Sequence, residues 1–267
     1  MPRKVILSRK GFDSKSGGWP SFIYGNRLVS LPIPGGGSGI FYNQLQFDSN
    51  TPLSVVMQQV GIAPYNECHL DPDLQQSFHA ERPKNWKAAF GQADQFEKRL
   101  KKYGVGTGDI FLFYGWFRAI RSVNGSYQYI KGAPNLHVIY GYMEMEEVFD
   151  LTDPGKKAPS YLVQHPHVVF REKYKNANRI YVGTNAGIFY FHDSLVLTRK
   201  GETRSRWELP SFFEKEPFMG ARTIDQLPNA NIGIDFRGRN NQELLITSTK
   251  EVVEWAEQLI QKNQVQK

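Results

Sequence analysis

The run His69-Leu70-Asp71-Pro72-Asp73 holds the residue types best suited to chemistry. Proline at position 72 disfavours a helix at Asp71 and predicts an extended segment. Alternate side chains of an extended chain share one face, so His69, Asp71 and Asp73 are expected to point the same way. One imidazole and two carboxylates could hold a divalent metal such as Mg²⁺ or Mn²⁺, or place a general base beside a substrate. The alternative is a turn in which Asp71 caps backbone amides.

A second pair of histidines, His165 and His167, flanks Pro166. We expect the proline to hold both imidazoles on one side of an extended segment. If this pair met the His69 run in space, three histidines and two aspartates would form a metal or acid–base centre. The alternative is a structural pair, which is the more common role of an isolated His-x-His.

Basic, amide and aromatic side chains supply candidates for binding a phosphate or a base. Arg9 and Lys10 follow a predicted strand and could clasp a phosphate, although a charged surface turn has the same pattern. Gln92 falls at an expected helix start, where it could bond a base edge or a phosphate-bearing ligand. Trp116 and Arg118 lie in an aromatic-rich strand. We therefore single out as nucleotide or phosphate ligands Arg9, Gln92, Trp116 and Arg118.

The composition is that of an ordinary globular protein. Of the 267 residues, 40% are hydrophobic and 22% are charged, which argues against wholesale disorder. The single cysteine, Cys68, excludes an internal disulfide framework and predicts a cytoplasmic protein. No segment approaches the length of a membrane span. A net charge of +7 and an aromatic content of 13% suit a partner that is anionic and has bases to stack, such as a nucleotide or DNA.

Hydrophobic periodicity predicts about three helices among many strands. The helices are expected at 51–60, 92–103 and 248–260, and the clearest strands at 5–7, 110–120, 127–130, 135–148 and 179–183. We expect one α+β domain over residues 1–267, dominated by antiparallel strands. In the block 106–148 the order of turn, long strand, hairpin and second strand resembles that of small PUA-like or EVE-like barrels, which bind RNA or modified bases. We therefore also expect a PUA-like barrel core.

Taken together, these motifs resemble the third type of the nucleotide modification associated domain family. The matching segments include ILSRKGFDSKSGG at 6–18, HLDPDL at 69–74, AFGQA at 89–93 and HPHV at 165–168, and further ones lie at 104–118, 132–141, 178–182 and 207–212. The resemblance implies a role in bacterial or phage systems that hypermodify DNA bases, with other proteins of such a system as partners. It implies no particular reaction. The glycine-rich insert at 35–39 and the region after 213 match the pattern poorly.

The interpretation we favour is an enzyme that acts on a nucleotide or a modified base through a polar cleft. No G-x-x-x-x-G-K-[ST] phosphate loop, G-x-S-x-G elbow or C-x-x-C pair is present to suggest a familiar mechanism. The expected cleft residues are Lys10, Asp13, His69, Asp71, Asp73, His165 and His167, with a divalent metal held by His69, Asp71 and Asp73. The alternative is a non-catalytic PUA-like or EVE-like module that reads modified bases.

Overall fold

The computed structural model describes residues 2–174, 176–236 and 242–264, and every structural statement refers to these residues. A central sheet has the strand order β14-β11-β9-β1-β18, formed by Ala186–Ile188, Leu136–Glu144, Ile110–Val123, Val5–Arg9 and Glu243–Thr247. Strand β1 is parallel to β9, and the other neighbours along this path are antiparallel. Strands β2 (Ser21–Tyr24), β3 (Arg27–Val29) and β10 (Ser126–Tyr129) extend the far end of β9.

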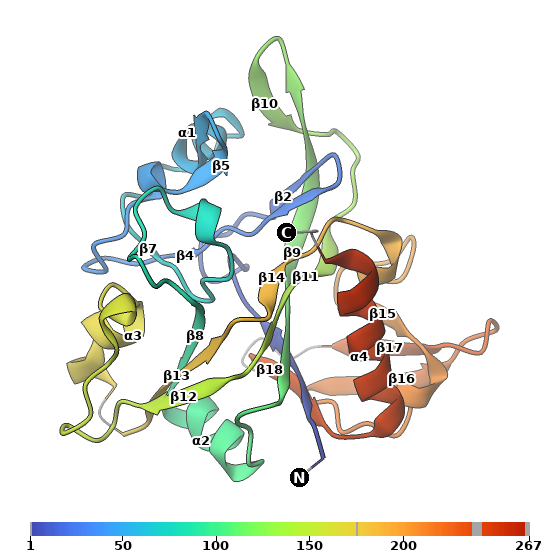
Figure 1. Cartoon of the computed structure of the whole chain (residues 1–267). Helices are drawn as coiled ribbons and strands as arrows, with labels where there is room; N and C mark the ends of the chain where they lie inside the picture. The colour runs from blue at the N-terminus through green and yellow to red at the C-terminus, as the bar shows by residue number, and fades with distance from the viewer. Residues whose placement is uncertain (1, 175, 237–241, 265–267) are drawn as a thin grey trace.

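Two three-stranded sheets flank the central one (Figure 1). One consists of β12 (Glu147–Asp150), β13 (Asn178–Gly183) and β8 (Ala88–Ala93), and the other of β15 (Arg206–Leu209), β17 (Ile232–Phe236) and β16 (Ala221–Gln226). Short pairs join β4 (Ile33–Pro34) to β7 (Cys68–His69) and β5 (Gln46–Asp48) to β6 (Thr51–Pro52). The helices are α1 (Leu53–Gln59), α2 (Asp94–Lys102), α3 (Pro166–Val169) and α4 (Lys250–Asn263).

Strand β9 is buried on both faces because a different layer covers each of them. Phe90 of β8 contacts the rings of Phe111 and Phe113, with centroids 4.8 and 5.2 Å apart. On the opposite face the ring of Tyr114 packs edge-on against Trp207 of β15 at 5.0 Å. Burial on both faces explains the nearly continuous apolar run of this strand. It also means that successive side chains of β1 and β9 face two different compartments.

The structure confirms a strand-dominated α+β fold, and it corrects three finer expectations. Within the described residues none of the sheets closes into a barrel, so the PUA-like core is wrong. Gln92 lies in β8 and pairs with Arg179, because strand pairing continues to Ala93 before α2 begins. Pro166 is the first residue of α3 rather than part of an extended segment, since proline fits the first helical turn.

Among the described helices, none is both long and apolar enough to cross a membrane.

Glu97 gives the folded protein a pH-dependent stability. This α2 residue is 1% exposed and accepts a 2.8 Å hydrogen bond from the Tyr181 hydroxyl. Burial raises its pKa from 4.5 to about 7, although Tyr181 and Arg179 oppose the rise. A raised folded pKa favours the protonated native state, so this contribution is complete below pH 4.5 and is lost as the pH rises to 7. We expect the change to reach about 3 kcal/mol.

Glu97→Gln should remove that pH dependence and stabilise the protein at pH 8 relative to the wild type. Urea unfolding gives the free energy of unfolding of both proteins at pH 5 and pH 8. The change between the two pH values is compared between wild type and variant, so that the contributions of the other titrating groups cancel. An equal pH dependence in the two proteins would show that Glu97 is ionised throughout.

Candidate functional site

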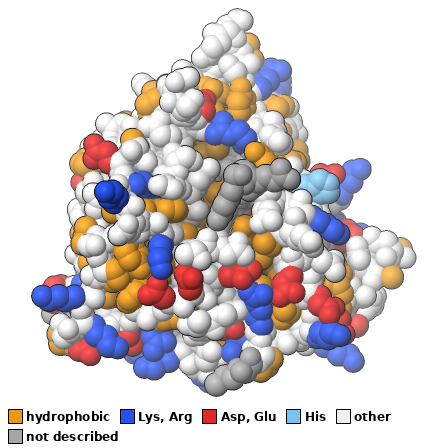
Figure 2. Space-filling view, viewed as in Figure 1, with side chains coloured by type: hydrophobic (Ala, Val, Ile, Leu, Met, Phe, Trp, Pro, Cys, Tyr) orange, Lys and Arg blue, Asp and Glu red, His pale blue; other side chains and the backbone are white. Residues whose placement is uncertain are grey.

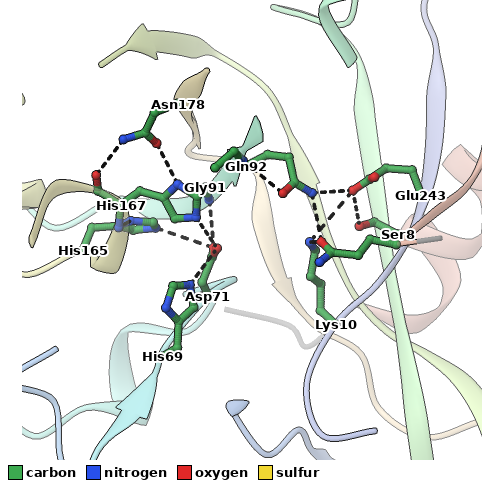
Figure 3. Close-up of polar contacts among 12 residues, drawn as sticks. Ser8, Lys10, His69, Asp71, Gly91, Gln92, His165, His167, Asn178 and Glu243 are labelled. Carbon is green, nitrogen blue, oxygen red and sulfur yellow. Dashed lines mark hydrogen bonds and ion pairs between the residues drawn. The ribbon is translucent and has the colours of Figure 1, made fainter. Parts of the chain in front are cut away.

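The carboxylate of Asp71 lies at the centre of a cluster of imidazoles (Figure 3). His69 Nε2 and His167 Nε2 lie 3.6 and 3.4 Å from its Oδ2, and His165 Nε2 lies 3.6 Å from its Oδ1. The backbone N–H of Gly91 donates a 2.8 Å hydrogen bond to Oδ1. The side chain of Asp71 is only 5% exposed. A buried carboxylate is thus held on all sides by nitrogen atoms, as the chemistry of a metal or acid–base centre requires.

Three separate elements bring these residues together. His69 ends β7, and Asp71 follows it two residues later. Gly91 belongs to β8, and its lack of a side chain is required because a Cβ there would overlap the His167 ring and lie 2.9 Å from His165 Cε1. His165 is the N-cap residue of α3 and His167 lies in its first turn. The HLDPDL, AFGQA and HPHV segments therefore meet in space, and Asp71 is their common contact.

Asn178 of β13 fixes the tautomer of His167. Its amide Nδ2 donates to the backbone carbonyl of His167 at 3.0 Å, which leaves Oδ1 facing the ring nitrogen Nδ1 at 2.8 Å. The Nδ1 atom must therefore carry the hydrogen of that contact. In the neutral ring the lone pair is then on Nε2, facing the Asp71 carboxylate. Two acceptors that face each other are stabilised by a cation between them, either a proton or a metal ion.

His165 differs from His167 in this respect. Its Nδ1 accepts the backbone N–H of His167 at 3.2 Å, so the hydrogen of the neutral ring is on Nε2. That N–H faces Asp71 at 3.6 Å and, within the described residues, this buried nitrogen has no hydrogen-bond partner. His165 therefore turns an N–H toward the carboxylate at a distance too long for a hydrogen bond, and in this tautomer it does not coordinate a metal.

The spacing of the remaining three residues suits a metal ion. Suitable ligand atoms of His69, Asp71 and His167 all lie within 4.8 Å of one another. Ligands about 2.1 Å from a tetrahedral Zn²⁺ are separated by about 3.4 Å, whereas a good N–H···O bond is about 2.9 Å long. The nitrogen–oxygen distances of 3.4 and 3.6 Å agree with the first value. The second contact of His167, to Asn178, matches the outer-shell bond typical of metal-binding histidines.

Electrostatics maintain the charge states that metal coordination needs. Burial lowers the pKa of His69, although Asp71 acts in the opposite direction. Burial alone would raise the pKa of Asp71, but the polar contacts of His165, His167 and His69 outweigh it and hold that pKa well below its usual range. A neutral imidazole and an ionised carboxylate are the forms that bind metal ions.

Lys10 belongs to a second polar network, beside the Asp71 cluster in Figure 3. Its ammonium donates to Gln242 Oε1 at 2.7 Å and lies 3.9 Å from Glu243 Oε1. Gln92 Nε2 donates to the same Glu243 oxygen at 2.6 Å, and Ser8 approaches it at 3.4 Å. Burial lowers the pKa of Lys10, while Glu243 and Asp71 act to raise it. The amine is therefore held in a nearly dry site next to the His/Asp cluster.

A cavity of about 180 Å³ reaches Asp71 from the side of β3 and the Phe78 turn. Aromatic and apolar side chains dominate its lining, including Phe47, Leu74, Phe78 and Tyr140. A cavity of roughly 150 Å³ holds one benzene ring. This cavity therefore has the volume of a single six-membered ring with its substituents, and Asp71 is the member of the cluster that lines it.

Asp73 lies outside the cluster. Its carboxylate accepts two hydrogen bonds from the guanidinium of Arg82 and one of 3.1 Å from Trp86 Nε1. The expected alternation from 69 to 73 requires a continuous strand, whereas β7 contains only Cys68 and His69. The structure thus places His167, rather than Asp73, beside His69 and Asp71.

The residues that we expected to bind a phosphate or a base do not lie together in the structure. Gln92 joins the Lys10 network, while Arg9, Asp13 and Trp116 line a different cavity. Arg118 donates to the Ile130 carbonyl at 3.2 Å. Of the residues that the sequence did not single out, Gly91 and Asn178 fix the His/Asp cluster and Glu243 anchors Lys10. Gly91 lies within the AFGQA segment, but its clearance role depends on α3, which no local pattern predicts.

The comparisons with known proteins give one clear result. No curated protein and no solved structure matches the chain. The family model described as nucleotide modification associated domain 3 matches residues 4–243, a range that contains every residue of the Asp71 cluster. The chain belongs to the nucleotide modification associated domain 3 family.

Proposed function

We propose that this protein is a metal-dependent enzyme that modifies a pyrimidine base, either in a nucleotide or in DNA. The observation that supports it most directly is the His167 lone pair, which Asn178 directs at the Asp71 carboxylate across 3.4 Å. A metal ion between these atoms would satisfy both acceptors. The membership in a nucleotide-modification family supplies the substrate class.

Two imidazoles and one carboxylate favour a first-row divalent metal such as Zn²⁺ or Fe²⁺ over Mg²⁺ or Ca²⁺. Three protein ligands leave coordination positions for water and substrate, which is typical of catalytic rather than structural sites. A bound metal would lower the pKa of a water ligand or orient a co-substrate. In this scheme His165 turns an N–H toward Asp71, and Lys10 is the nearest buried amine for proton transfer.

The small cavity supports a base as the reacting group. At about 180 Å³ it is too small for a whole nucleotide, so the sugar and phosphate would stay outside. A pyrimidine fits this volume better than a purine does. If the substrate is duplex DNA, the base must first be turned out of the stack.

The test combines metal analysis with product detection. We expect the purified protein to bind about one equivalent of a first-row metal by mass spectrometry, and chelation to abolish its activity. Thermal-shift measurements follow, with mononucleotides and with plain or hypermodified oligonucleotides, each with and without the metal. A ligand at a hundred times its dissociation constant adds about 2.7 kcal/mol of stability. Nucleoside analysis of the incubated oligonucleotides then identifies the product.

The outcomes separate the enzyme from the reader. Metal-dependent stabilisation together with a new nucleoside supports the enzyme, and the metal found separates hydrolytic from oxidative chemistry. Stabilisation by modified DNA alone, without metal or turnover, favours a non-catalytic module that reads modified bases. A protein that neither retains nor responds to any first-row metal contradicts the metal centre.

A further inference from the structure

A second, larger cavity lies on the other face of the central sheet. Its volume is about 850 Å³, within the range of small-molecule sites, roughly 300–1,000 Å³. Arg9 and Lys10 are neighbours at the end of β1, yet their side chains face opposite sides. Lys10 lies 4.5 Å above the ring of Phe90 in β8, whereas Arg9 lines this cavity with Trp207 of β15. The cavity is therefore separate from the Asp71 cluster.

More basic than acidic side chains line the cavity. Arg9, Lys15 and Arg204 line it, together with Asp13 and Glu202. Asp13 accepts backbone N–H bonds of 2.7 and 2.8 Å and forms an ion pair with Arg9 at 3.6 Å. Glu202 pairs with Arg206 at 3.1 Å. Arg204 bonds the Ser14 hydroxyl, and no carboxylate of the described residues pairs with it. The charge of Asp13 acts on Arg204 without a direct ion pair, so this half-buried guanidinium can still accept an anionic ligand.

One face of the molecule carries no continuous basic patch. On the face shown in Figure 2, lysine and arginine side chains alternate with aspartate and glutamate. An extended polyanion would therefore find no broad positive surface on this face. Arg204 and Arg9 line one cavity, and its volume suits a small anionic molecule.

Aromatic and neutral polar groups complete the cavity. The Arg204 guanidinium lies 4.0 Å above the ring of Trp116, whose Nε1 donates to Asn135 at 2.9 Å. His137 Nδ1 accepts a 3.0 Å hydrogen bond from Trp207, so Nε2 carries the hydrogen. That donor has no acceptor in the described part of the chain. Burial, followed by the charges of Arg204 and Arg9, lowers the pKa of His137 to about 3 and keeps the ring neutral.

We propose that this cavity is a second nucleotide site, which binds a nucleoside 5′-monophosphate apart from the Asp71 centre. The phosphate lies against Arg204 and Arg9, and the base lies within reach of the His137 donor. The volume accommodates a base, a sugar and a phosphate, in contrast to the single ring that fits beside Asp71. The molecule would thus hold one nucleotide on each face of its central sheet.

Calorimetric titration with the four deoxynucleoside 5′-monophosphates tests the site. The parent nucleosides and inorganic phosphate are titrated under the same conditions. We expect at least one monophosphate to bind, and both its nucleoside and phosphate alone to bind at least tenfold more weakly. Arg204→Gln should weaken binding of the monophosphate at least tenfold. Arg121→Gln, which changes an exposed arginine that does not line the cavity, should leave it unchanged.

Two further variants keep the result interpretable. Lys15→Gln alters an exposed side chain on the cavity rim, so it tests the phosphate contact even if Arg204→Gln fails to fold; we expect about threefold weaker binding. His69→Gln tests independence from the metal centre and should not change the affinity at this cavity. Absence of binding by all four nucleotides at millimolar concentration, or binding lost in His69→Gln and retained in Arg204→Gln, would overturn the proposal.

Discussion

Asp71→Asn should lower the affinity for a first-row metal by at least about a hundredfold and abolish activity. Loss of an outer-shell partner already costs 10–100-fold in such sites, and Asp71 is the only anionic ligand of the set. The amide oxygen of asparagine can still accept the Gly91 N–H, but the charge that the three imidazoles stabilise is lost. We therefore expect the metal-free variant to fold and to be destabilised by about 1–3 kcal/mol. Metal titration and thermal unfolding of the apoprotein measure the two effects separately.

Asp73→Asn is the matched control. The substitution is chemically identical and two residues away, but it acts on the carboxylate that Arg82 and Trp86 hold. We expect it to destabilise the fold by about 1.5–3 kcal/mol, since charge-assisted hydrogen bonds are lost, and to leave metal affinity unchanged. If Asp73→Asn loses the metal and Asp71→Asn keeps it, the carboxylate at position 73 is the ligand; the sequence alone predicted that both carboxylates bind the metal.

Gly91→Ala should disable the site by steric overlap rather than by removing a functional group. The added methyl overlaps the His167 ring and approaches His165, and neither ring can move without leaving Asp71. We expect a loss of at least tenfold in metal affinity, together with about 1–3 kcal/mol of destabilisation from overpacking. Metal titration and urea unfolding provide both values.

Gly187→Ala tests whether that effect is specific. Gly187 also lies in a strand, but a Cβ there finds its nearest neighbour at an ordinary 3.7 Å, in Tyr142. This variant should stay within about 0.5 kcal/mol of the wild type and bind metal normally. Equal losses in the two variants would mean that the strand backbone, and not the histidine pair, is sensitive to alanine.

The sequence predicted which residues form the site better than it predicted how those residues are arranged. His69, Asp71, His165 and His167 stand out in the sequence because histidine and aspartate flank prolines there, and the structure brings these four together. The inclusion of Asp73 followed from assuming regular alternation through a segment that is a strand for only two residues. The position of the Asp73 carboxylate is determined by its tertiary contact with Arg82, which the local sequence does not predict.

The same distinction holds for the fold. Composition and turn residues predicted a strand-dominated α+β protein, and periodicity located the helices near residues 53, 94 and 250. The predicted barrel was wrong because the spacing of hairpins determines only which neighbouring strands pair. Whether a sheet closes into a barrel depends on which distant strands pair with its two edges. In this protein β18 and β14 occupy the edges of the central path. The sequence did not identify Gly91 and Asn178 as site residues because their roles depend on the packing of α3 against β8 and β13.

The register of the parallel pair β1 and β9 determines which side chains reach each face of the central sheet. Arg9 pairs opposite Tyr114, and this register sends Arg9 to the large cavity and Lys10 to the Glu243 network. Inserting or deleting one residue in β1 would exchange the two side chains between faces. Both sites would then fail together, although neither had been mutated. The length of β1 is therefore constrained by both sites at once.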